Sequence, residues 1–109
     1  MIDTLAITGA LRERFRGTRH GIFLYTDPAY GSIWTLTVYP DETMRSDIPH
    51  WTFTWNPFAI EGETVPLLTA TSPDGKVTRV EHNGGSPYNV RQFADYVENA
   101  VKGTAEWAP

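Results

Sequence analysis

Three histidines, His20, His50 and His82, are the side chains of this chain best suited to acid–base or metal chemistry near neutral pH. A catalytic or metal site needs two or more of them to converge with a carboxylate. No pair has a metal-binding spacing such as His-x-x-x-His, so only the fold can bring them together. Because His50 begins a predicted strand and His82 ends one, they can share an edge of a sheet. Without a motif the sequence predicts no metal, no cofactor and three ordinary loop-end histidines.

Nucleophilic catalysis needs a serine or threonine held beside a base, and the chain has no Gly-x-Ser-x-Gly elbow. Ser72 and Ser86 both precede proline, which is typical of turns and caps. Gly84-Gly85 lacks the surrounding pattern of a phosphate-binding loop. The carboxylate pair Glu61/Glu63 flanks a glycine in a connection, where its simplest role is solubility. We therefore predict no catalytic residues and a protein that is not an enzyme.

The composition narrows the class of protein. The chain has 109 residues, a formal charge of −4, 13% aromatic residues and no cysteine. This length suits one domain, residues 1–109, and the absence of cysteine excludes disulfides and thiol chemistry. No apolar run is long enough to cross a membrane, and no signal peptide precedes the first predicted element. We expect a cytoplasmic domain.

The charge is unevenly distributed along the chain. Residues 1–20 carry four arginines and two carboxylates, a sum of +2, whereas residues 21–109 carry five basic and eleven acidic residues, a sum of −6. The acidic body argues against direct binding of nucleic acid, which needs basic side chains on one face. Arginines in the last turn of a helix complement its dipole, and this is the simplest role for the N-terminal cluster. The alternative is an anion-binding site formed by Arg12, Arg16 and Arg19.

Hydrophobic periodicity predicts a helix at each end of the chain. Over 3–16, Ile7, Leu11 and Phe15 recur at helical spacing, and Gly17 follows as a stop signal. Over 89–102 an apolar stripe follows a capping asparagine. Between the helices the period changes to two, which predicts strands over 21–26, 32–39, 50–56, 65–71 and 76–82. The segment 72–75 has the order of a type I turn followed by a glycine at positive φ.

Short loops between consecutive strands favour an antiparallel sheet. The expected fold is therefore an α+β two-layer sandwich, with about five mainly antiparallel strands and both helices on one face. Alternation places Trp34, Trp51, Phe53 and Trp55 under the helices as core. Fourteen residues are threonine, and many share the opposite strand parity. That face carries Thr35, Thr37, Tyr39, Thr52, Thr54, Thr69 and Thr71.

A neutral, hydroxyl-bearing sheet face can bind a protein at low cost in side-chain entropy. Acidic residues in two loops would steer a basic partner towards it. These are Asp41, Glu42 and Asp47 in the first loop and the acidic residues of 61–63 in the second. The sequence thus favours a small, acidic, non-enzymatic protein-binding module, monomeric or homodimeric. The order of elements, with Trp107 after the last helix, is similar to that of short immunity proteins of bacterial toxin systems. That similarity covers only the element order and Trp107, and it implies an inhibitor or immunity-type protein.

Two other classes of function remain open at this point. The first is a small-ligand-binding or hydrolase-like domain that uses His50, His82 and Glu61 in a pocket between sheet and helices. The second is a homo-oligomeric structural subunit that pairs through an edge strand or through the sheet face.

Overall fold

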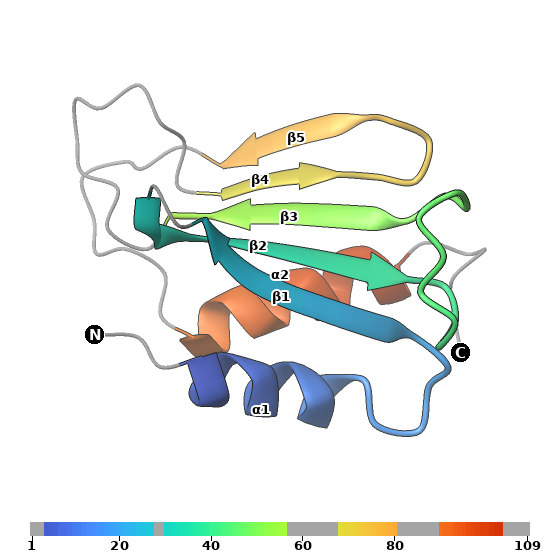
Figure 1. The fold of residues 1–109 in the computed structure, drawn as a ribbon, viewed down its shortest axis with the longest axis horizontal. Coiled ribbons are helices and arrows are strands. Elements are labelled where there is room, and N and C mark those ends of the chain that lie inside the picture. The colour runs from blue at the N-terminus through green and yellow to red at the C-terminus, as the bar shows by residue number, and fades with distance from the viewer. Residues whose placement is uncertain (1–3, 28–29, 57–67, 81–89, 104–109) are drawn as a thin grey trace.

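The computed structural model describes residues 4–27, 30–56, 68–80 and 90–103 (Figure 1). Along the chain, one helix precedes and one follows five strands. The elements are α1 (Thr4–Arg14), β1 (Gly21–Asp27), β2 (Tyr30–Tyr39), β3 (Trp51–Trp55), β4 (Leu68–Thr71), β5 (Val77–Val80) and α2 (Val90–Lys102). The strands form one sheet in the order β1-β2-β3-β4-β5, and every neighbouring pair is antiparallel. Both helices lie on the same face of this sheet. The predicted α+β two-layer fold is confirmed.

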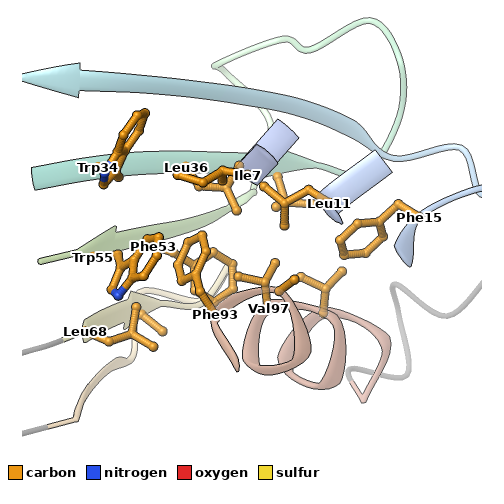
Figure 2. Packing of buried hydrophobic residues seen from close by; sticks show 14 residues of the cluster. Ile7, Leu11, Phe15, Trp34, Leu36, Phe53, Trp55, Leu68, Phe93 and Val97 are labelled. Atoms are coloured by element: carbon orange, nitrogen blue, oxygen red, sulfur yellow. The ribbon is translucent and has the colours of Figure 1, made fainter. Parts of the chain in front are cut away.

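The core lies between the sheet and the two helices, as Figure 2 shows. Alternate apolar side chains of β2 and β3 point into it. Trp55 stacks on Phe93 of α2 with ring centroids 4.4 Å apart. The stripe predicted for the first helix points into the same core from α1. Among the residues that the structure describes, the largest fully buried side chains are Trp55, Phe53, Phe93, Ile7, Leu11, Leu36, Leu68, Val38, Val97 and Val101. The period-two aromatics are therefore structural, and Trp51, which is partly buried, packs against the edge of the core and stacks on Phe53.

The boundaries of the elements differ from the predicted ones by a few residues. The first helix ends at Arg14, two residues earlier than predicted, and Gly17 follows at φ +80°. β3 is one residue shorter at each end than the predicted strand. Gly75 has φ +87°, as the predicted turn requires. Residues 65–67, 81–82, Asn89 and Trp107, on which further predictions fall, lie outside the described residues.

Replacing Gly9 with alanine is expected to stabilise the protein by about 0.5–1 kcal/mol, because alanine restricts the unfolded chain and favours helix. Gly9 lies inside α1, and a Cβ atom there would meet nothing within 4 Å. The same change at Gly17 is the matched control, since its φ of +80° strains any side chain although space is open there too. Urea unfolding of both variants measures the two effects. If Gly9→Ala were less stable than the wild type, Gly9 would not lie inside a helix with free space for a Cβ atom.

Candidate functional site

Two rows of side chains cross the sheet face that points away from the helices. The registers of the four strand pairs place the residues of each row opposite one another. The first row is Phe23, Thr37, Thr52, Thr71 and Val77, and the second is Tyr25, Thr35, Thr54, Thr69 and Arg79. We call these ten residues the open face. Six threonines thus occupy its centre on β2, β3 and β4, as the predicted alternation requires.

The open face combines hydroxyls with exposed apolar groups. Phe23 and Tyr25 on β1 are 53% and 46% exposed, and Val77 on β5 is 56% exposed. The two aromatic rings lie side by side with centroids 5.7 Å apart. Thr54 is exposed, while the other five threonines are half-buried between their neighbours. Strands are spaced by about 4.8 Å, so the threonines form a closely packed, uncharged patch with an aromatic border.

Phe23, Val77 and Arg79 belong to this face, although they are not among the residues predicted for it. The signal was present for Phe23, because it shares its strand parity with Tyr25. For Val77 and Arg79, sequence alternation does not show which face of the sheet each side chain lies on. β5 is short, and its residues do not alternate between apolar and polar. Only the register Thr71↔Val77 and Thr69↔Arg79 places them on the open face.

The predicted polar loop 40–49 contains the acidic stretch 41–47, and we call it the acidic loop. It follows Tyr39 at the end of the sheet where β1 begins (Figure 1). Gly21 makes this placement possible, because a Cβ atom there would lie 2.7 Å from the Asp41 carbonyl oxygen and 2.5 Å from Met44 Cγ. The rings of Tyr39 and His50 contact each other, with centroids 5.2 Å apart, and so join the two ends of the loop. Since Tyr39 pairs with Gly21 in the register, the loop borders the open face.

Two of the three steering carboxylates predicted in this loop have partners within it, whereas the second predicted steering loop, 61–63, lies outside the described residues. Asp41 accepts hydrogen bonds from the backbone and hydroxyl of Thr43, and the Thr43 hydroxyl is the largest cause that lowers the pKa of Asp41. Asp47 forms an ion pair with Arg45 at 2.7 Å. Glu42 is exposed. The loop therefore keeps a net negative charge, three carboxylates against one guanidinium, but Asp47 is largely compensated.

The histidines do not form a site among the residues that the structure describes. His50 Nδ1 lies 2.8 Å from the Ile48 carbonyl oxygen, at the loop end beside Tyr39. His20 packs edge-on against Phe15, with ring centroids 5.2 Å apart. No group of three histidine, aspartate or glutamate side chains in the described part of the chain could hold a metal ion. His82 and Glu61, the other members of the predicted ligand pocket, lie outside the described residues.

The N-terminal arginines have different surroundings. Arg16 pairs with Glu13 at 2.9 Å on the exposed side of α1. Arg19 is exposed and close enough to Asp41 to act on it electrostatically. Arg12 is exposed and lines two hollows between α1 and β1. The three predicted anion-binding residues therefore do not share one partner.

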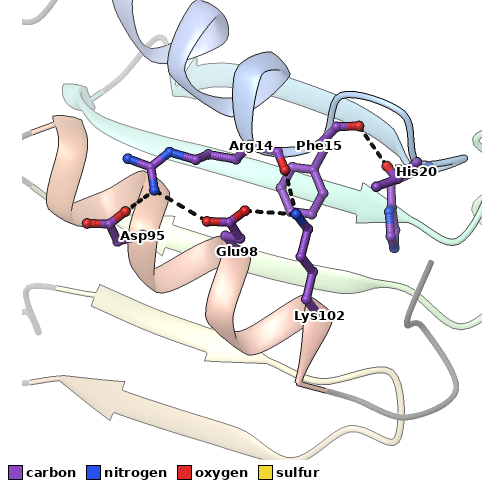
Figure 3. Close-up of polar contacts among 7 residues, drawn as sticks. Arg14, Phe15, His20, Asp95, Glu98 and Lys102 are labelled. Carbon is purple, nitrogen blue, oxygen red and sulfur yellow. Dashed lines mark hydrogen bonds and ion pairs between the residues drawn. The ribbon is translucent and has the colours of Figure 1, made fainter.

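Arg14, the fourth arginine, has the most contacts, and its role was not predicted. Its guanidinium lies between Asp95 and Glu98 of α2, as Figure 3 shows. Glu98 also accepts a hydrogen bond from Lys102 Nζ at 2.8 Å, and the same ammonium donates to the Arg14 carbonyl oxygen at 2.7 Å. The hydrogen bond to Asp95 is the largest cause that raises the pKa of Arg14. These charges fasten α1 to α2, so they serve the fold.

Neither described helix has the length and apolar composition that a membrane span requires. Comparison of the chain with protein family models, with curated proteins and with solved structures found no match.

Proposed function

We propose that this protein is a non-enzymatic protein-binding module whose open face docks a basic protein partner. The observation that carries the proposal is the sheet face that neither described helix covers, where exposed Phe23 and Tyr25 border a patch of six threonines. Aromatic side chains contribute much of the energy of protein interfaces, and uncharged centres are typical of them. An inhibitor or immunity-type role, acting in the cytoplasm, is the form of this proposal that the sequence favours.

Charge supports a basic partner. Residues 21–109 sum to −6, and exposed Glu42 lies in the acidic loop that borders the open face. Charges at the rim of an interface mainly accelerate association, whereas the centre holds the complex together. Glu42 would therefore act on the rate of association, and the threonines and aromatic rings on the rate of dissociation.

The substitution Thr54→Lys tests the proposal, because Thr54 is exposed at the centre of the open face. Thr78→Lys is a matched control: Thr78 is also an exposed strand threonine, but its partner Ala70 places it on the helix side of the sheet. The wild type and both variants are immobilised and exposed to an extract of the native host. We expect a basic protein that binds the wild type and Thr78→Lys and binds Thr54→Lys roughly tenfold or more weakly.

The captured protein is then purified for kinetic measurements. Glu42→Lys is expected to slow its association at low salt and to leave dissociation nearly unchanged. Full binding by Thr54→Lys would contradict the proposal. Light scattering of the protein alone tests the alternative, since a dimer that Thr54→Lys dissociates would assign the open face to a second copy of this chain.

A further inference from the structure

A groove runs between α1 and the outer edge of β1. One hollow of about 230 Å³ is lined by Thr8, Leu11 and Arg12 of α1 and by Ile22, Phe23 and Leu24 of β1. A second hollow of about 300 Å³ continues it towards the start of the strand, where Phe15, His20, Gly21, Glu42 and Met44 form its walls. Arg12 and Ile22 line both hollows, so the two are adjacent. Figure 1 shows α1 lying alongside β1.

The backbone beside this groove is suited to pairing with another strand. β1 is the terminal strand of the sheet order, so among the described strands its outer edge has no neighbour. Every second residue of an edge strand presents its N–H and C=O groups outwards. Natural edges are commonly protected by lysine, proline or shortness, and residues 21–26 contain neither a charge nor a proline. The opposite edge differs, because β5 has only four residues and carries Arg79.

The chemistry of the groove indicates what would pair there. Ile22 and Leu24 face the helix side with Leu11, so alternate side chains of an added strand would enter hollows that these apolar side chains line together with polar ones. Exposed Arg12 lines both hollows, and it has no ion-pair partner within the described ranges, whereas Arg14 and Arg16 do. A carboxylate is the group that a free guanidinium binds best.

We propose that this groove binds an extended peptide segment as a sixth strand, with apolar side chains in the two hollows and a carboxylate on Arg12. The peptide's backbone satisfies the outward groups of β1, and its side-chain pattern provides the specificity. A second copy of the chain fits less well, because pairing through its own β1 would bring its α1 into the same groove. The groove adjoins the open face, because Phe23 lines the first hollow and Glu42 of the acidic loop lines the second. Its charged anchor is Arg12, however, which selects a carboxylate on the bound peptide.

Selection from a phage-displayed library of random heptapeptides on the immobilised full chain tests the proposal. We expect enriched sequences in which apolar residues alternate and one aspartate or glutamate recurs. Synthetic copies of these peptides are then titrated by fluorescence anisotropy. Arg12→Glu is expected to weaken their binding about 10- to 100-fold, as the loss of a charge-assisted hydrogen bond implies. Arg16→Glu is the matched control, since Arg16 is also exposed, two residues after α1, but lines neither hollow; the affinity of this variant should stay within about twofold.

Hydrogen exchange distinguishes strand addition from other binding modes. Bound peptide should slow exchange at alternate backbone amides of 21–24 and leave β5 unchanged. Methylation of the peptide nitrogens that face β1 should abolish binding, whereas methylation of the alternate nitrogens should not. Thr54→Lys, which tests protein binding by the open face, should leave peptide affinity unaltered. The peptide-groove proposal and the open-face proposal can therefore fail independently. A selection that enriches no peptide family, or binding that survives both Arg12→Glu and Arg12→Gln, would overturn the proposal.

Discussion

Replacing Trp55 with alanine is expected to destabilise the protein by about 3–5 kcal/mol, which is the usual cost of truncating a buried tryptophan. Trp55 is fully buried in β3, and its ring lies nearly parallel to that of Phe93, at an interplanar angle of 7°. The substitution removes this stacking and leaves a cavity between sheet and α2 that the surrounding strands cannot close. Since small domains are stable by only about 5–15 kcal/mol, a large part of the total would be lost. The midpoint of urea unfolding measures it.

Val77→Ala is the control for this experiment. Val77 also lies on a strand, but it is 56% exposed on the open face, so its truncation should change stability by no more than about 0.5 kcal/mol. A double-mutant cycle with Phe93→Leu isolates the stacking contribution, for which about 0.5–1.5 kcal/mol is typical. If Trp55→Ala cost as little as Val77→Ala, the assignment of the aromatic parity to the core would be wrong.

The sequence was sufficient to divide the sheet into its two faces. Alternation over β3 assigned Phe53 and Trp55 to the core and Thr52 and Thr54 to the open face, because the side-chain period of a strand is strictly two. It could not supply the register. Whether Thr54 lies opposite Thr35 or Thr37 depends on the geometry of the loop between the strands. The same geometry decides that Tyr25 and Arg79 lie in one row across the sheet.

The contacts between helices were beyond the reach of sequence patterns for a related reason. Arg14 and Asp95 are 81 residues apart, and nothing local signals their ion pair. Arg14 therefore looked like one member of an exposed basic cluster, although it is the arginine that the fold uses. The same limit applies to the acidic loop, where a sum of charges could not reveal that Arg45 compensates Asp47. The net charge that a surface presents to a partner follows from the composition only once the charges that pair with each other within the chain are known.

Glu98→Gln is expected to cost about 1–2 kcal/mol at pH 7, because the carboxylate binds two cations between the helices. Glu98 lies 2.8 Å from Lys102 Nζ and 3.3 Å from Arg14 Nη1, and its side chain is 25% exposed, so solvent screens the pair only partly. Glu13→Gln is the matched control. Its partner Arg16 is 78% exposed and Glu13 itself 64%, so its loss should change stability little at any pH.

The pH dependence of the same variant separates the charge of Glu98 from its shape. Hydrogen bonding to Lys102, together with Arg14, lowers the pKa of Glu98 in the folded protein below its ordinary value of 4.5. A lowered folded pKa stabilises the protein above the unfolded pKa, and this stabilisation is lost as the pH falls through the folded value. The difference between wild type and Glu98→Gln should therefore be constant from pH 7 to pH 5 and disappear in more acidic solution, where protonated glutamate resembles glutamine. A difference that persisted after Glu98 is protonated, well below its folded pKa, would assign the effect to packing. Arg14 with Asp95 would then be the charged link that holds α1 to α2.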